Sequence, residues 1–219
     1  CLFVQERATT GRPPLSLHVA LPICFRLLEI ATASGDRDAR TARLRDLVQV
    51  DATAGAQRSE RSRYLAAIAS IELADPVRRR FAVVRLTQPL AASLKRKRAL
   101  MEEVIEVYTK AAEYGVAEVT TVATFRLGEV YEHFSADLLD SERPRDLDAE
   151  TLEQYDLLLE EQVYPFEEKA IDLYKANANR APDGVYDEWV KKSFERLASL
   201  MPARYSKLER SEDVVTALY

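Results

Sequence analysis

The chain has 219 residues, of which 47% are hydrophobic and 31% are charged, so it can bury a sizeable core in one large domain or two small ones. Its 6 glycines and 9 prolines are fewer than the roughly 12% of a globular chain that these residues usually supply, which predicts few turns and long helices. The formal net charge is −5, and no run reaches the roughly 18 uninterrupted apolar residues of a membrane-spanning helix, so that class of segment is excluded.

Residues 1–24 differ from the rest of the chain, since they hold 3 of the 9 prolines, both cysteines and one of the two histidines. The run LSLHVALPI at 15–23 closely resembles one reading frame of a common sequencing-library adapter, with Val19 in place of an aspartate. We therefore interpret 1–24 as a non-native or disordered segment and exclude it from the fold. The alternative, Cys1 as a mature lipoprotein N-terminus, predicts a flexible polar tether that does not follow it. Any signal peptide is expected upstream of residue 1.

The segment 25–74 is predicted to be helical. A helix over 25–50 is expected to break at 34–36, where the sequence is Ser-Gly-Asp, and 51–55 is expected to form a turn. Helical spacing of apolar residues resumes from Ala56, interleaved with small alanines that let a neighbouring helix come close.

Two prolines are expected to mark helix boundaries in the next part of the chain. Asp75 and Pro76 predict the start of a new helix, with Asp75 as N-cap and Pro76 at the first helical position, where its missing N–H costs nothing. Pro89 predicts either another start or a kink. The helix that follows is expected to exceed twenty residues and to run to Tyr114, with Gly115 as its C-terminal cap.

An amphipathic helix is predicted from Ala117. One apolar stripe follows helical spacing and consists of Leu127, Val130, Tyr131, Phe134 and Leu138. The helix should end near Ser141, before a polar loop over 142–148, and Asp148 is the expected N-cap of another long helix. Pro165 is expected to kink or divide that helix.

The C-terminal part is predicted to hold one more helix. Asn and Pro residues over 177–184 should end the preceding helix, and apolar spacing over 185–200 predicts the last one, ended by Pro202. Residues 206–219 are expected to form a frayed tail. Since no segment alternates with period 2 for long, the fold class is predicted to be all-α.

Charge is distributed unevenly along the chain. Residues 25–110 carry 17 basic and 11 acidic side chains, whereas 111–219 carry 12 and 24. Nucleic acid would be attracted to one half and repelled by the other, so we do not expect it as a partner. A protein partner, or a second copy of the chain paired through the opposed charges, is expected instead.

The residue types available exclude several kinds of catalytic chemistry. Beyond residue 24 there is no cysteine and the single histidine is His133, so a disulfide framework, a Cys/His zinc site and a Cys-His nucleophile pair all lack their parts. His133 is interpreted as a partly exposed residue on a helix flank. We expect no catalytic residue, no metal and no cofactor, and therefore a protein that is not an enzyme.

The chain carries two pieces of the tetratricopeptide-repeat pattern. The first-helix motif W-x2-L-G-x2-Y is resembled by Thr124, Leu127, Gly128 and Tyr131, with Thr124 in place of tryptophan. The second-helix motif A-x3-F with a later proline is resembled by Ala170, Tyr174 and Pro182, with Tyr174 in place of phenylalanine. The second piece begins 39 positions after Tyr131, where the family has about 9. Either one repeat carries an insertion around 142–148 with lengthened helices, or the pieces belong to two different degenerate repeats.

The resemblance to tetratricopeptide proteins implies a fold and packing positions. It implies a right-handed α-solenoid of antiparallel helical hairpins over 25–205, with degenerate repeats and long helices. Small residues would lie where helices cross, aromatic residues would fill the gaps between repeats, and a proline would end the pair; these positions are Leu127, Gly128, Tyr131, Ala170, Tyr174 and Pro182.

Four segments resemble, more narrowly, bacterial cell-envelope tetratricopeptide proteins, some of which are linked to TonB/ExbD-like energy-transducing systems. These segments are 113–134, 141–148, 160–171 and 184–205. This resemblance implies a scaffold that is periplasmic or associated with the outer membrane.

Basic and aromatic side chains are the candidates for binding a partner. The basic candidates are Lys95, Arg96, Lys97 and Arg98, downstream of three arginines at 78–80. Four consecutive helical residues cannot share one face, so a solvated helix stretch is the simpler interpretation. Of seven aromatic residues considered, most are expected in the core; the set is Tyr64, Tyr108, Tyr114, Tyr155, Tyr164, Tyr186 and Trp189. Tyr108, Tyr155 and Trp189 are the aromatic candidates for a partner surface.

The sequence thus predicts a non-enzymatic helical-repeat scaffold that mediates protein–protein interaction in a bacterial cell-envelope assembly. The alternative is a cytoplasmic regulatory module that binds a small ligand or nucleic acid through its basic N-terminal half.

Overall fold

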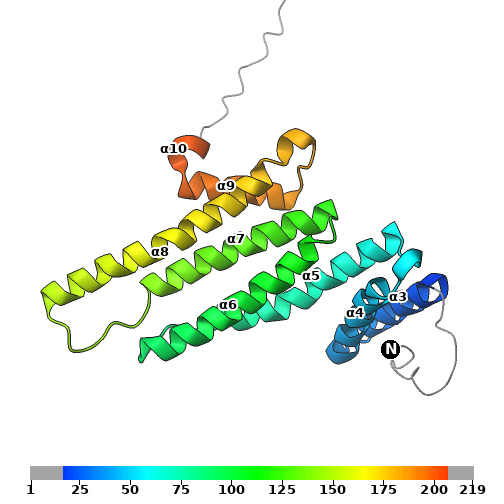
Figure 1. The fold of residues 1–219 in the computed structure, drawn as a ribbon, viewed down its shortest axis with the longest axis horizontal. Helices are drawn as coiled ribbons and strands as arrows, with labels where there is room; N and C mark the ends of the chain where they lie inside the picture. The colour runs from blue at the N-terminus through cyan, green and yellow to red at the C-terminus, as the bar shows by residue number, and fades with distance from the viewer. Residues whose placement is uncertain (1–16, 207–219) are drawn as a thin grey trace, which may run out of the picture.

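The computed structural model describes residues 17–206, and helices are the regular secondary structure of this part of the chain (Figure 1). The helices are α3 (Leu17–Ala33), α4 (Arg37–Ala52), α5 (Glu60–Ala82), α6 (Leu90–Ala112), α7 (Ala117–Leu139), α8 (Ala149–Ala178), α9 (Glu188–Leu200) and α10 (Pro202–Tyr205), with 3₁₀ turns η1 (Gly55–Gln57) and η2 (Ala181–Asp183). The all-α prediction is confirmed.

Each helix packs against the next one along the chain, and α5 also contacts α7, as α7 contacts α9. Figure 1 shows α7 lying between α6 and α8. Packing between neighbours and next-but-one neighbours is the arrangement of a helical solenoid, in which no single hairpin can bury its apolar face alone. The handedness of the solenoid stays a prediction.

Several predicted helix ends are confirmed. The Asp36 carboxylate caps α4 after the break at 34–36, and the Asp148 carboxylate caps α8 by accepting a 2.8 Å hydrogen bond from the Thr151 amide. Gly115 follows α6 with a φ of +66°, a conformation that favours glycine.

The predicted helix start at Asp75 and Pro76 is wrong, because α5 runs unbroken through both residues. The Asp75 carboxylate does not cap a helix; it accepts hydrogen bonds from the guanidinium groups of Arg78 (2.8 Å) and Arg79 (2.5 Å) within the same helix. Pro76 is exposed, so the carbonyl that its missing N–H leaves without a helical bond lies towards solvent. Burial of apolar residues on both sides of the proline outweighs this local signal.

Pro89 follows one of its two predicted alternatives, whereas Pro165 does not divide its helix. Pro89 is the N-cap residue of α6, so it marks a helix start. Pro165 lies inside α8, which remains a single helix of 30 residues and is not divided.

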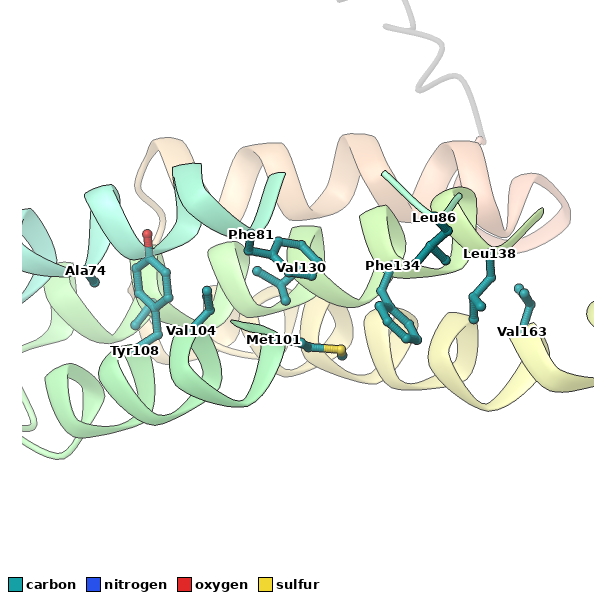
Figure 2. Packing of buried hydrophobic residues seen from close by; sticks show 11 residues of the cluster. Ala74, Phe81, Leu86, Met101, Val104, Tyr108, Val130, Phe134, Leu138 and Val163 are labelled. Carbon is teal, nitrogen blue, oxygen red and sulfur yellow. The ribbon is translucent and has the colours of Figure 1, made fainter. Parts of the chain in front are cut away.

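The main core lies between α5, α6 and α7, with one contribution from α8 (Figure 2). Its buried members are Ala74, Phe81, Leu86, Met101, Val104, Tyr108, Ala123, Val130, Phe134, Leu138 and Val163. Three residues of the predicted α7 stripe are among them, and the other two, Leu127 and Tyr131, pack against the cluster half-buried. The stripe therefore has the orientation that the sequence predicts.

Helix α8 approaches α7 closely at Gly128. A Cβ atom placed on Gly128 would lie 2.6 Å from Cε1 of the fully buried Tyr174 ring. The Tyr174 hydroxyl donates a 2.9 Å hydrogen bond to Glu132, and Ala170 lies buried in the same cluster one turn earlier. The two motif pieces therefore come from consecutive helices of one hairpin with lengthened helices, while Pro182 lies exposed in η2 beyond it.

The predicted boundary at residue 24 falls inside a helix. Helix α3 begins at Leu17, and Leu21 and Cys24 are buried against Leu44 and Leu47 of α4. The predictions for the remainder of the N-terminal segment and for the C-terminal tail fall on residues 1–16 and 207–219, outside the described residues.

Replacing Gly128 by alanine is expected to destabilise the fold by about 1–3 kcal/mol, because the new methyl group meets the Tyr174 ring. Urea denaturation followed by circular dichroism measures the change. Ala136→Ser, at an exposed position on the same helix, is the matched control and should stay within about 0.5 kcal/mol of the parent. Equal stability of G128A and the parent would contradict the close approach.

Stability should fall at alkaline pH through Tyr174. Burial raises the pKa of the Tyr174 phenol, and the Glu129 carboxylate raises it further. Because the folded pKa lies above the unfolded value of about 10, the stabilisation is complete below about pH 10 and is lost as the pH rises towards the folded pKa. At neutral pH, Tyr174→Phe should lower the free energy of unfolding by about 0.5–1.5 kcal/mol, because the hydroxyl hydrogen bond is lost. Between neutral and alkaline pH, the free energy of unfolding of this variant should fall less than that of the parent. Parallel pH profiles of the free energy of unfolding would refute this assignment.

Candidate functional site

A groove of about 580 Å³ opens where α4, α5 and α6 meet, and we call it the Tyr114 groove. It is lined by Val48, Arg58, Ser70, Leu73, Ala74, Val107, Lys110, Glu113 and Tyr114. Aliphatic side chains from all three helices contribute to the lining, and the charged residues that join them carry both signs. The groove therefore combines an apolar surface with polar groups that can orient a ligand.

One edge of the groove is held by a buried carboxylate. Asp51, which is 2% exposed, accepts a 2.9 Å hydrogen bond from Nε of Arg58 and a 2.7 Å hydrogen bond from the Ser62 hydroxyl. The guanidinium carbon of Arg58 lies 5.7 Å from the centre of the Tyr114 ring. Asp51 therefore joins the end of α4 to the start of α5 and fixes an arginine beside the aromatic residue of the groove.

Sequence reasoning named Tyr114 among its aromatic residues but missed Asp51 and Arg58. Asp51 lies in the last turn of α4, and Arg58 lies in the connection to α5, seven residues later. Because α4 ends at Ala52, this spacing is not helical here, and only the folded connection brings the two side chains together. The sequence did contain one signal for this pair: an apolar helical segment ends in the isolated acidic residue Asp51, and the basic residue Arg58 lies in the loop that follows.

The predicted basic run divides into exposed and buried members. Lys95, Arg96 and Arg98 are exposed, and none of them makes an ion pair among the residues that the structure describes. The upstream arginines are instead compensated, since Arg78 and Arg79 pair with Asp75 and Arg80 pairs with Glu103.

The prediction that Lys97 belongs to a solvated, partner-binding stretch is wrong, because its side chain is fully buried. Its ammonium group donates to the carbonyl oxygens of Phe81 (3.2 Å) and Val84 (2.7 Å), which end α5, and forms an ion pair with Asp137 of α7. The nitrogen also lies 4.4 Å from the centre of the Phe81 ring. Lys97 thus ties three helices together.

His133 lies at the edge of the same cluster. Its side chain is 45% exposed, and Nε2 lies 3.2 Å from the Asp137 carboxylate. This confirms its interpretation as a partly exposed residue on a helix flank.

The aromatic candidates do not form one surface. Tyr108 is 1% exposed in the main core, so the prediction that it contacts a partner is wrong. Tyr155 is half-buried beside Arg143, and Trp189 is half-buried with the charged groups of Arg126 (4.7 Å) and Lys192 (4.4 Å) near its ring centre. The latter two occupy separate places on α8 and α9, and neither lines the Tyr114 groove.

A second groove, of about 410 Å³, lies between the end of α5 and the first half of α6, and we call it the Val83 groove. It is lined by Arg80, Val83, Val84, Arg96, Ala99, Leu100 and Glu103. Arg96 is thus the predicted site residue that borders a groove, with Val83 exposed to 77% beside it.

Comparison with protein-family models, curated proteins and solved structures found no match. Over residues 17–206, no helix has the combination of length and apolar character needed to cross a bilayer. In the same range, no group of three or more histidine, cysteine, aspartate or glutamate residues is arranged to hold a metal ion.

Removing the buried ammonium group with Lys97→Met should cost about 2–4 kcal/mol, since the carbonyl oxygens of Phe81 and Val84 lose their ammonium donor and Asp137 loses its lysine partner. This expected destabilisation is smaller than that for breaking a fully buried ion pair, because the Asp137 side chain is 22% exposed. Lys95→Met, two residues away on the exposed face, should change stability by less than about 0.5 kcal/mol. Similar unfolding midpoints in urea for the two variants would contradict a structural role for Lys97.

Proposed function

We propose that this protein is a helical-repeat scaffold that binds a segment of a partner protein in the Tyr114 groove. The observation that carries the proposal is the composition of that groove, in which an apolar surface is bordered by Arg58, Lys110 and Glu113. Apolar anchoring with a few placed polar groups is how helical-repeat surfaces recognise peptide segments.

The fixed position of the Arg58 side chain also supports the binding of a partner segment. Because Asp51 and Ser62 hold one edge of the groove in the free protein, less conformational freedom is lost when a ligand arrives. Tyr114 presents a rigid ring to the groove, and such rings are common energetic centres of protein interfaces. A partner segment with an apolar side chain flanked by polar residues fits this lining.

The cellular setting is part of the proposal. A place in a cell-envelope assembly, either periplasmic or at the outer membrane, is supported by the resemblance of the four segments named above to envelope tetratricopeptide proteins. The second candidate, a cytoplasmic module that binds a small ligand, is favoured by one observation: the volume of the Tyr114 groove lies within the range of small-molecule sites.

Site-specific photo-crosslinking in cells of the source organism tests the proposal. A photoreactive amino acid at Val107 lies in the Tyr114 groove, whereas one at Tyr186, which is 63% exposed, lies elsewhere and is the control. Val107 should give defined protein–protein products that Tyr186 does not give. Tyr114→Ala should lower their yield about 10-fold or more, whereas Tyr186→Ala should not, with folding checked by circular dichroism.

Identical products from both positions, or no protein product from Val107, would overturn the proposal. A thermal shift of the purified protein by a small metabolite, lost in Tyr114→Ala and accompanied by no protein crosslink, would favour the small-ligand alternative.

A further inference from the structure

Helix α8 presents an apolar strip on the side that faces away from the core. Leu157 and Tyr164 are exposed to 56% and 58%, and their spacing of seven residues puts them on one face of the helix. The buried residues Leu159, Val163 and Ala170 lie on the opposite face, against the rest of the protein. We call the exposed side the outer face of α8.

Carboxylates flank this strip on both sides. The exposed acidic residues of the helix from its first turn to its centre are Glu150, Glu153, Glu160, Glu161, Glu167 and Glu168. None of them forms an ion pair with lysine or arginine within residues 17–206, and on the strip itself the Tyr164 hydroxyl donates a 2.8 Å hydrogen bond to Glu168. The outer face is thus both apolar and negatively charged, without internal compensation.

The Val83 groove offers the complementary surface. Its apolar lining comes from Val83, Val84, Ala99 and Leu100, and its charged lining consists of Arg96 and the mutually paired Arg80 and Glu103. Lys95 lies one turn before Ala99 on the same side of α6, is exposed, and like Arg96 forms no ion pair within residues 17–206. The two surfaces match in the two properties that decide helix-in-groove docking, namely apolar anchors and opposite charge.

The two surfaces cannot meet within one molecule. Helix α7 packs between α6, which carries the basic residues, and α8 (Figure 1). The outer face of α8 points away from α7, since the α8 residues that are buried lie on its other side. The acidic face can therefore reach only the groove of another molecule.

We propose that a second copy of this chain docks the outer face of its α8 into the Val83 groove. Leu157 and Tyr164, about 10 Å apart along the helix axis, supply the apolar anchors, and the flanking glutamates meet Lys95 and Arg96. Because the two surfaces differ, the contact either closes into a two-fold dimer that uses it twice or continues from molecule to molecule. This inference goes beyond the proposed function and uses no residue of the Tyr114 groove.

Charge reversal with the purified protein tests the proposal. A groove variant carries Lys95→Glu and Arg96→Glu, and a helix variant carries Glu153→Lys, Glu160→Lys and Glu161→Lys. All five positions are exposed, so both variants should fold. The parent should self-associate in sedimentation velocity, more strongly at low salt, and each variant alone should associate about 10-fold or more weakly.

A mixture of the two variants gives the most specific test, because it restores opposite charges across the contact. The reversed helix of one variant then faces the reversed groove of the other, and the unreversed pair is also retained, so association should return to near the parent level. A control with Asp38→Lys, Asp183→Lys and Glu195→Lys changes the net charge as the helix variant does but at exposed positions elsewhere, and it should associate like the parent.

A parent that stays monomeric, a mixture that does not recover, or a control that weakens association equally would each overturn the proposal. A photoreactive residue at Leu157 that captures a different protein in cells, with the purified parent monomeric, would assign the outer face to that partner instead. None of these results affects the crosslinks from Val107, so failure here is distinguishable from failure of the proposed function.

Discussion

The close approach of α7 and α8 at Gly128 sets the geometry of the C-terminal half. Without a side chain at this position, the Tyr174 ring can lie against the α7 backbone and reach Glu132 with its hydroxyl. Glu132 also pairs with Arg196 of α9, so a single carboxylate connects three consecutive helices. A bulkier residue at 128 would push the Tyr174 ring away from α7 and disturb this connection, so we expect the crossing to tolerate little change.

Two further buried polar groups connect the N-terminal half in the same manner. Lys97 joins the end of α5 to α6 and α7, and Asp51 joins α4 to α5 beside the Tyr114 groove. Apolar packing alone leaves neighbouring helices free to slide in small steps, whereas a buried charge must keep its partners because losing them is costly. We infer that these contacts fix the relative positions of the helices that form the two grooves.

Local signals let the sequence predict the helical class, most helix ends and the α7 stripe, because an N-cap such as Asp148 acts within one turn. The same signals failed at Pro76, where burial of residues on both sides keeps α5 continuous. They also placed Lys97 and Tyr108 on the surface, since a pattern does not show which of several charged or aromatic side chains faces the next helix. The groove was beyond prediction for a related reason: its lining comes from segments about 60 residues apart.

The packing of each helix mainly against its sequence neighbours has a consequence for how the chain folds and opens. Contacts of short sequence separation can form without closing long loops, so folding is expected to be fast and able to start within any hairpin. Local unfolding should likewise differ from helix to helix along the chain. Amide protons of α7, which contacts helices on both sides, should exchange most slowly, whereas those of α3 can exchange by detachment from α4 while the rest stays folded.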